Sequence, residues 1–386
     1  MPDVLVLDCH TTHSLAAIRA LGRRGLTTTV ASHRAWNPGR LSRHAGTFLR
    51  LPDPAVAQAA YLDAVEAELQ ARTYDVVVPV TESTVDLVVR NRDRVEPHAA
   101  LPFPPYETLE VGLDKGQTIE AARALDVAHP RTMTATEVDL DAVGDELGFP
   151  VVVKPHYGSG REGVATAASP TELEPLYERT VAAHGPTLVQ EYVPDGGERG
   201  VYTIYDREGT LAGVTVQERL RSRHPDGGAS TLRETVVDPD LIRRADRLLA
   251  GLGWFGVAMV EFRIDPRDGA AKLLELNPRF WGSLPLSIAA GVDFPGLLYR
   301  LGIGEPLDRD LSYTAGVRAR CLFADLLQVF EREDVLRALC KYVVPSRTRT
   351  HHDVVRLSDP LPTVGKLALL GADLRAAVTE RVGAAG

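Results

Sequence analysis

Cysteine is scarce in this 386-residue chain, which has only Cys9, Cys321 and Cys340. Their odd number and wide scatter exclude a disulfide framework and a paired-cysteine metal site. No apolar run approaches the ~18 residues that a membrane-spanning helix needs, and the opening residues lack the basic segment of a signal peptide. The net charge of −9 argues against a nucleic-acid surface. We therefore expect a cytoplasmic protein without nucleic-acid or membrane partners.

Glycine is also missing from the first strand-to-helix turn, DCHTTHS at residues 8–14. This absence removes the dinucleotide fingerprint and argues against a nicotinamide enzyme. Around the turn, strand-like runs at 4–8, 27–32 and 75–80 alternate with helix-like runs at 14–25 and 54–72. The pattern predicts a doubly wound α/β domain over residues 1–110.

The pattern changes after residue 110. A helix and a strand running into a glycine-rich turn are followed by two β-hairpins, the first turning at Arg207-Glu208-Gly209 and the second near residue 268. Between the hairpins, RSRHPDGGAST at residues 221–231 is glycine-rich and basic, which is typical of a loop. We expect a first lobe over 111–195, a second lobe over 196–308 and a mostly helical extension over 309–386.

The second hairpin carries three oxygen-bearing side chains on one face. If Ile264 pairs with Lys272, then Phe262 pairs with Leu274, Val260 with Leu276 and Glu261 with Glu275, and Asn277 shares the face of the two glutamates. Two like charges directly opposite on a sheet are destabilising. A divalent metal ion such as Mg²⁺ would offset the repulsion. From the hairpin alone, an ordinary solvated acidic edge is an equally good interpretation.

Two other segments suit an anionic nucleotide. Lys154 ends a strand, and Gly158, Gly160 and Gly163 follow it, so backbone N–H groups and a lysine could approach phosphate oxygens. In LVQEYVPDGGE, residues 188–198, the backbones of Glu191 and Val193 could meet a flat heterocycle and Glu198 could bind sugar hydroxyls. Taken separately, each segment is also a common structural pattern.

Together and in this order, the segments resemble the ATP-grasp superfamily, with the closest similarity to the carbamoyl-phosphate-synthase-like group of carboxylate–amine ligases. The resemblance covers about residues 114–293, and its last segment is the most specific. The segments are LDKGQTIE (113–120), FPVVVKP (149–155), LVQEYV (188–193), MVEFRID (259–265) and LLELNPRFWGSLPLSIAAGVDFP (273–295). The resemblance implies a glycine-free α/β domain in front of a two-lobed fold that holds ATP and two Mg²⁺ ions, with Mn²⁺ as an alternative ion.

The resemblance also implies a role for individual residues. Phosphates would be contacted by Lys115, Lys154 and the loop of Gly158, Ser159, Gly160 and Gly163; adenosine by Glu191, Tyr192, Val193 and Glu198; the metals by Glu261, Glu275 and Asn277; and the transferred phosphoryl group by Arg279 and Lys154. One departure is the pair Gln190-Glu191, where many relatives place an acid and then a lysine. The side chain that assists adenine is therefore left open.

The expected reaction activates a carboxylate as an acyl phosphate and couples it to an amine, releasing ADP and phosphate. Lysine, arginine and metal ions would neutralise the approach of two anions. Two alternatives stay open. The same ATP site could serve a carbamoyl-phosphate-type or other acid-phosphorylating reaction, or the protein could be a non-catalytic ATP sensor. A homodimer is also left open.

Several further residues have two interpretations each. His10 and His13 follow the first strand, where substrates bind in open α/β sheets, but they are more simply loop residues. Glu82 would suit a substrate amine or a helix N-terminus equally well. The pair His351-His352 is typical of a solvated surface, Trp281 of packing, and the arginines of residues 219–233 give only weak evidence for a functional role.

Overall fold

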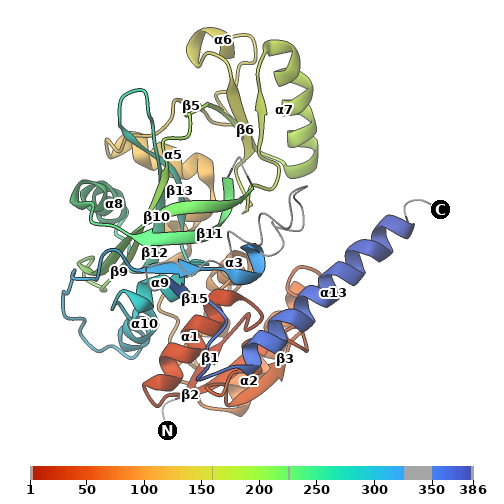
Figure 1. Cartoon of the computed structure of the whole chain (residues 1–386), viewed down its shortest axis with the longest axis vertical. Helices are drawn as coiled ribbons and strands as arrows, with labels where there is room; N and C mark the ends of the chain where they lie inside the picture. Colours follow the sequence, from red (N-terminus) through yellow and green to blue (C-terminus); the bar gives the residue numbers. More distant parts are fainter. Residues whose placement is uncertain (1–2, 159, 225–226, 326–349, 384–386) are drawn as a thin grey trace. The chain divides into compact units, whose positions relative to one another are not determined.

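The computed structural model describes residues 3–158, 160–224, 227–325 and 350–383 (Figure 1). The chain divides into two compact units. Unit 1 contains Met1–Phe103, Arg279–Asp308 and Val317–Gly386, and unit 2 contains Pro104–Pro278 and Arg309–Gly316. No described helix combines the length and the hydropathy that crossing a membrane requires.

A four-stranded parallel sheet in the order β3-β2-β1-β4 forms the centre of unit 1. Its strands are β1 Asp3–Val6, β2 Thr27–Ser32, β3 Thr47–Arg50 and β4 Val76–Val78. The chain leaves β1 toward β2 on one side, and later returns to β4 on the other side. Every residue of β4 is buried, as its continuous valine run predicts.

Helices connect these strands, and the predicted α/β alternation is confirmed. Thr11 caps α1 by accepting a hydrogen bond from the Ser14 N–H, and Thr81 caps α3 in the same way with Thr84. The helices are α1 Thr12–Arg23, α2 Gln58–Ala71, α3 Glu82–Arg90, the 3₁₀ turn η1 Arg92–Arg94, α9 Leu284–Ala289 and α10 Phe294–Gly302.

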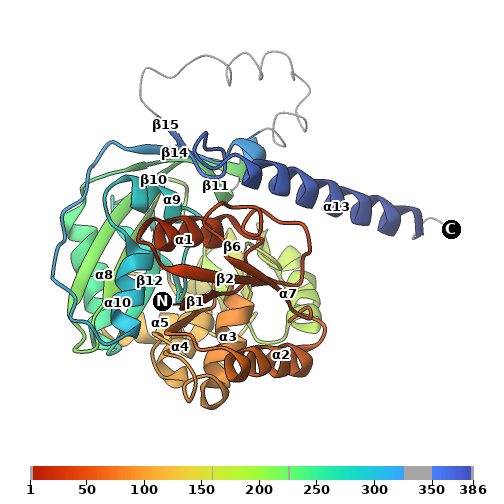
Figure 2. The same ribbon diagram turned by 90° about the horizontal axis from the view of Figure 1, so that it is seen from below.

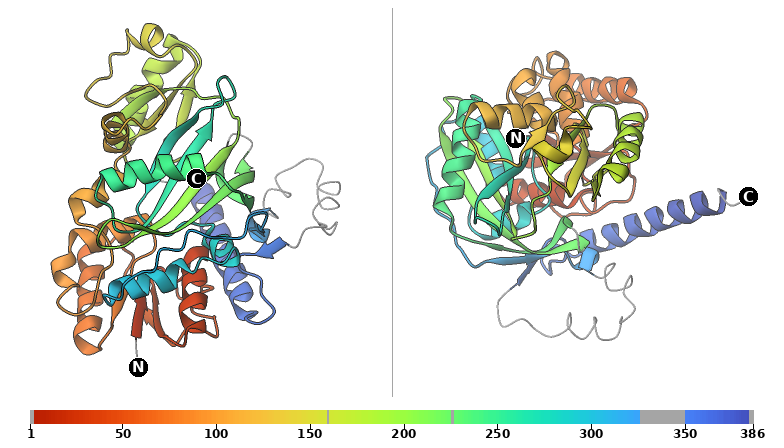
Figure 3. Two further views of the ribbon diagram at one scale, coloured as in Figure 1. Left: turned by 90° about the vertical axis from the view of Figure 1, so that its left-hand side faces the viewer. Right: turned by 90° about the horizontal axis from the view of Figure 1, so that it is seen from above.

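The last part of unit 1 contains strands as well as helix. β14 (Arg318–Arg320) and β15 (Thr350–His352) pair in parallel, which places His351 and His352 in a strand at intermediate exposure. After them, α13 (Leu361–Gly383) is one uninterrupted helix (Figures 2 and 3). Residues 326–349, which belong to the extension expected to be mostly helical, lie outside the described residues, and Cys340 is among them.

Unit 2 contains a small antiparallel sheet in the order β5-β8-β6-β7, with α7 packed beside it (Figure 1). Val151, Val153 and Val189 form the centre of its apolar core. The elements are β5 Thr132–Met133, α6 Val143–Glu146, β6 Val151–Pro155, β7 Ala165–Ala167, α7 Pro170–His184 and β8 Thr187–Glu191.

A larger antiparallel array in unit 2 contains the two predicted hairpins, in the order β13-β12-β9-β10-β11. Its core gathers Trp254, Val260 and Phe262 beneath the sheet, together with apolar residues of α8. The elements of this region are α4 Tyr106–Leu113, α5 Lys115–Ala124, β9 Glu198–Tyr205, β10 Leu211–His224, β11 Gly227–Thr235, α8 Pro239–Gly251, β12 Gly256–Ile264 and β13 Ala271–Asn277.

The predicted pairing of β12 with β13 is right at the acidic end and wrong near the turn. Glu261 pairs with Glu275 and Val260 with Leu276, but Phe262 pairs with Leu273, not Leu274. Leu274 is the extra residue of a β-bulge, so Leu273 enters the core in its place. Strict alternation along the sequence cannot show such an insertion.

The basic segment at residues 221–231 is also different from the prediction. It belongs to β10 and β11, which pair from Gln217–Thr235 to His224–Gly227 with several irregularities of register. Residues 225 and 226 lie outside the described residues. The glycines and charges that favoured a loop instead occur in a twisted, irregular ribbon.

Candidate active site

The acidic face of β12 and β13 is the centre of the candidate site in unit 2. Glu261 lies directly between two strand partners, Glu275 on β13 and Gly200 on β9. The side-chain amide of Asn277 donates a hydrogen bond of 3.0 Å to Glu275 Oε1. The three predicted metal ligands are therefore brought together, and the register selected by the apolar pattern is confirmed where they lie.

The two glutamates resist being charged at the same time. Burial raises the pKa of Glu261 well above its ordinary value, against the attraction of Arg219, and the charge of Glu275 and a hydrogen bond to it add to the rise. Two carboxylates and an amide oxygen are the hard ligands that Mg²⁺ prefers, so this donor set fits a divalent ion. Among the described residues, no cluster of three or more His, Cys, Asp or Glu side chains suits a metal.

Arg219 on β10 is the cation next to this pair, and sequence reasoning gave it little weight. Its Nη2 donates to Glu261 Oε1 at 2.6 Å, and its Nη1 forms an ion pair with Glu198. Arg263 forms an ion pair with the other oxygen of Glu198. The residue expected to hold the ribose is thus bound by two arginines. Assigning the segment after residue 219 to a loop concealed that Arg219 belongs to the same sheet.

Two lysines approach each other at the end of β6. Lys154 is almost fully buried, and its Nζ donates to the backbone oxygen of Leu274, the bulge residue, at 3.3 Å. Burial and the neighbouring charge of Lys115 lower the pKa of Lys154 to about 8. Neither lysine forms an ion pair with any carboxylate in the described part of the chain, so an anion would complete this group.

A buried Asp–His pair positions Lys115. Asp114 caps α5 by accepting from the Gly116 and Gln117 N–H groups, and its Oδ1 lies 2.9 Å from His156 Nδ1. Although burial opposes it, the hydrogen bonds from His156 and the Gln117 backbone lower the pKa of Asp114 to about 2. The Lys115 N–H donates to the His156 oxygen at 3.0 Å. This pair joins α5 to the end of β6.

The glycine-rich loop after β6 has the backbone that its sequence predicts. Gly158 and Gly163 have φ of 114° and 69°, and a Cβ on Gly163 would lie 2.7 Å from Pro155. Lys115 Nζ donates to the Gly158 oxygen at 2.5 Å, so lysine and loop are brought together. Gly160 also has a positive φ, whereas Ser159 lies outside the described residues.

The segment expected to contact adenine is partly occupied by its own sheet. The N–H groups of Glu191 and Tyr192 donate to the oxygens of Arg131 and Pro150. The Glu191 carboxylate lies 2.6 Å from Lys272 Nζ. Burial opposes ionisation, but the hydrogen bonds from Lys272 and Arg131 lower the pKa of Glu191. Lys272 therefore provides a cation beside the end of β8.

Arg279 belongs to unit 1, although it follows Asn277 by only two residues. Its Nη2 lies 3.3 Å from Glu82 Oε2, and its Nη1 donates to the Phe280 oxygen at 3.2 Å. Glu82 is the first residue of α3. Trp281 is fully buried and packs edge-to-face against Phe294, which confirms its packing role.

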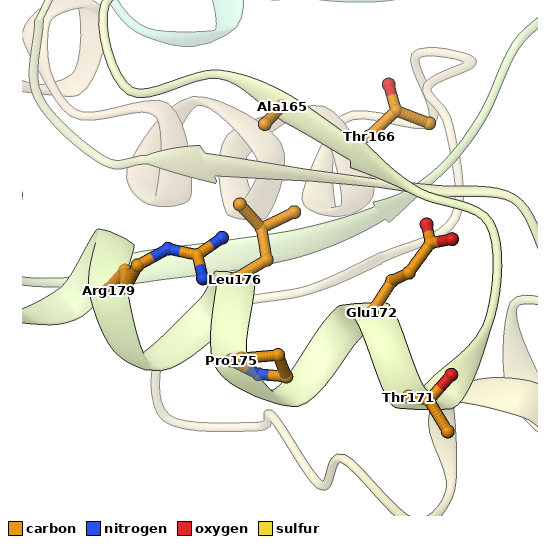
Figure 4. Close-up of a pocket in the computed structure, with 7 residues that line it drawn as sticks. All are labelled: Ala165, Thr166, Thr171, Glu172, Pro175, Leu176 and Arg179. Atoms are coloured by element: carbon orange, nitrogen blue, oxygen red, sulfur yellow. The ribbon is translucent and has the colours of Figure 1, made fainter.

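A separate hollow of about 350 Å³ lies beside α7 (Figure 4). Its walls come from β7 and α7, and none of the predicted site residues lines it. It is lined by Ala165, Thr166, Thr171, Glu172, Pro175, Leu176 and Arg179.

Comparisons with known proteins agree with this fold and these segments. Residues 184–322 match the family described as ATP-grasp in the biosynthetic pathway with Ter operon. The carbamoyl phosphate synthase large chain of Micrococcus luteus is 30% identical over 188 residues, which are 46% of this chain and 17% of that protein. The chain spans about a fifth of the length of the curated relatives it matches.

Solved structures share the fold at low sequence identity. A biotin carboxylase complex from Campylobacter jejuni has a TM-score of 0.67 at 17% identity, over 82% of this chain and 74% of that one. An L-amino acid ligase from Bacillus licheniformis has a TM-score of 0.63 at 20% identity, over 80% and 75%. The family match, the relatives and the fold agree with the resemblance to the ATP-grasp superfamily that the sequence indicates.

Proposed function

We propose that the protein is an ATP-dependent carboxylate–amine ligase: it activates a carboxylate as an acyl phosphate, couples it to an amine and releases ADP and phosphate. The observation that carries the proposal is the opposed pair Glu261 and Glu275 with Asn277 beside it. A half-buried pair of like charges is costly without a function, and a nucleotide with Mg²⁺ provides one.

The proposed nucleotide contacts follow from which groups are available. Lys115 and Lys154 would contact phosphate oxygens, together with the loop of Gly158, Ser159, Gly160 and Gly163. The N–H groups of Glu191 and Tyr192 already donate hydrogen bonds to backbone oxygens, so the N–H of Val193 is the best donor to adenine. Glu198 would accept from the ribose hydroxyls once Arg219 or Arg263 releases one of its oxygens.

Glu261, Glu275 and Asn277 would hold Mg²⁺, which neutralises the nucleotide and the attacking acid when bound; two ions, or Mn²⁺ in their place, are proposed from the resemblance. Lys154 would hold its proton on Nζ and stabilise phosphate charge, and Arg279 would do the same for the transferred group. The acceptor is then an amine on a small molecule.

The four-part division of the chain at residues 110, 195 and 308 remains a prediction. A cytoplasmic location and a homodimer also remain predictions.

Hydroxylamine trapping tests the reaction directly. The purified chain is incubated with ATP, Mg²⁺ and pools of carboxylates, with and without amines, while ADP and hydroxamate are measured. We expect ADP release that depends on a carboxylate, and hydroxamate formation without any amine. ADP release that is indifferent to every carboxylate would contradict the proposal.

A further inference from the structure

Arg263, on β12, contacts two residues that the proposed function assigns to different parts of adenosine. Its Nη1 donates to the backbone oxygen of Val193 at 3.3 Å, and its Nη2 donates to Glu198 Oε1. Val193 would meet the adenine ring, and Glu198 would meet the ribose hydroxyls. All three residues belong to unit 2. One planar guanidinium therefore sets the spacing between the two expected contacts.

The position of Arg263 in the sheet explains why it reaches the candidate site. On one side of β12 it pairs with Glu198 of β9, and on the other side it pairs with Lys272 of β13. Because side chains alternate along a strand, Arg263 lies on the same face of β12 as Glu261. Only 18% of its side chain is exposed, so the guanidinium has little freedom to leave its two oxygens.

The chain between the two contacted residues is itself held against β12. The Gly196 N–H donates to the Ile264 oxygen at 3.1 Å, and the Ile264 N–H donates to the Gly197 oxygen at 2.9 Å. A Cβ on Gly196 would lie 2.5 Å from the same Ile264 oxygen, so glycine is required for this close approach. Arg263 therefore acts on a segment whose backbone is already fixed at the next residue of β12.

Arg219 also contacts Glu198, but its second contact is of a different kind. Arg219 binds Glu198 through Nη1 and the carboxylate of Glu261 through Nη2. A metal ion at Glu261 would compete with Arg219 for that carboxylate. The second contact of Arg263 is instead a neutral backbone oxygen outside the proposed metal ligands. Arg219 therefore has to rearrange when nucleotide and metal bind, whereas Arg263 can stay in place and keep Glu198 oriented.

The contact with Val193 leaves the other side of that residue available. Arg263 binds the Val193 oxygen, while the Val193 N–H donates to no residue in the described part of the chain. The Val193 side chain is buried, so the residue is held by its side chain and by its carbonyl group. A free N–H on an otherwise fixed residue is a preorganised donor for a ligand.

We propose that Arg263 is a positioning residue for the adenosine half of ATP: it holds the Val193 backbone for the adenine ring and the Glu198 carboxylate for the ribose hydroxyls. The inference rests on the proposed function, because that function places the nucleotide here. It does not depend on the identity of the acid or the amine.

Competition binding to the whole chain with Mg²⁺ tests the proposal, with three ligands. They are ATP, 2′,3′-dideoxy-ATP, which lacks both ribose hydroxyls, and inorganic tripolyphosphate, which lacks adenosine. We expect wild type to prefer ATP over 2′,3′-dideoxy-ATP by about tenfold, as is typical of hydrogen bonds to a charged group. Arg263→Met should weaken ATP binding by about tenfold or more, remove most of that preference and leave tripolyphosphate binding unchanged.

Arg199→Met is the matched control. Arg199 is also an ion-paired arginine of this sheet, bound to Glu218 and Asp238, but it follows Glu198 directly and so lies on the opposite face. It should bind all three ligands as wild type does. Arg263→Lys keeps a positive charge for Glu198 without the planar fork, so it should regain part of the preference for ATP. In turnover assays, Arg263→Met should raise the KM for ATP much more than it lowers kcat.

A preference for ATP over 2′,3′-dideoxy-ATP that is absent in wild type, or unchanged in Arg263→Met, would overturn the proposal. An equal loss of tripolyphosphate binding, or an equal loss in Arg199→Met, would do the same. If Arg263→Met does not fold, Arg263→Lys provides the same comparison. Wild type that binds no ATP would overturn both this inference and the proposed function. ADP release that ignores every carboxylate, with the expected loss in Arg263→Met, would remove the ligase function alone.

Discussion

Two groups of carboxylates in this protein, one buried and one half-buried, have opposite surroundings. In unit 1, the carboxylate of Asp359 accepts from the Arg19 side chain at 2.8 Å, the Ser42 hydroxyl at 2.7 Å and the Arg43 N–H at 2.9 Å. In unit 2, Glu261 and Glu275 pair directly across two strands, with Arg219 donating to Glu261 and Asn277 donating to Glu275. The first carboxylate stands alone among three donors, whereas the second group brings two like charges together.

The difference suggests what each group is for. A charge whose donors all come from the chain contributes to folding and leaves nothing for a ligand. A pair of opposed charges costs stability, and such groups persist where binding or catalysis uses them. We therefore expect changes at Glu275 to affect turnover, and changes at Asp359 to affect stability alone.

Glu275→Gln should have the largest effect. It removes one charged ligand of the proposed metal site, so we expect turnover to fall by about a thousandfold, the upper range for loss of one electrostatic contact in an active site. The melting temperature should stay the same or rise, because the repulsion from Glu261 is relieved. Both are measured by ADP release and calorimetry, with Glu208→Gln in the exposed turn after β9 as the control. Retained turnover would exclude the metal role.

Asp359→Asn should have the opposite result. It leaves the buried Arg19 without its counter-charge, so we expect a loss of about 3 kcal/mol in the free energy of unfolding, with unchanged turnover per folded molecule. Asp240→Asn breaks an exposed pair with Arg243 and should cost less than ~0.5 kcal/mol. Equal losses in the two variants would contradict the distinction between satisfied and exposed charges.

The contribution of Asp359 to stability depends on pH. Despite its burial, hydrogen bonds from the Arg43 backbone, Arg19 and Ser42 lower the pKa of Asp359. Its contribution is therefore complete above the unfolded carboxyl pKa of about 3.9 and is lost as pH falls through the lower folded value. Wild type and Asp359→Asn should converge in stability as acid is added.

The sequence predicted the opposed glutamates better than it predicted their surroundings. Alternation of Val260 and Phe262 with Glu261 fixes which face the acids occupy, because a slip of one residue would bury them. Nothing in that alternation shows that Leu274 is extra. The carbonyl contact from Lys154 to Leu274 is therefore visible only in the structure.

Most of the other contacts that the sequence did not predict join residues that are distant in sequence. Arg219 reaches Glu261 across 42 positions, and glycines and basic residues in the following segment favoured a loop. In unit 1, Arg19 and Asp359 are 340 positions apart, and no local pattern can pair them. Local periodicity predicts which face of a strand is buried, whereas the partners of a buried charge depend on the tertiary fold.

A substitution at Lys154 should have an effect of intermediate size. Its burial without an ion pair to any described carboxylate is costly, so Lys154→Met should raise the free energy of unfolding by about 1–3 kcal/mol while nucleotide binding is lost. With a folded pKa of about 8 against an ordinary 10.5, the penalty is complete below pH 8 and disappears as pH rises to 10.5. Lys115→Met, at a half-exposed lysine, should lose binding without this gain. A destabilised Lys154→Met would show that the lysine serves the fold.

Arg219→Gln should give the smallest effect and the finest distinction. The guanidinium on Glu261 neutralises the charge that a divalent ion would otherwise meet, and it must be displaced or repelled as the ion binds. Without it, Mg²⁺ should bind about tenfold more tightly, a gain of about 1.4 kcal/mol that appears as a larger Mg²⁺-dependent rise in melting temperature. Arg243→Gln, on the exposed face of α8, should show the wild-type Mg²⁺ response. An unchanged response in Arg219→Gln would mean that the ion does not use Glu261, and the contrast between the two groups of carboxylates would then depend on Glu275 alone.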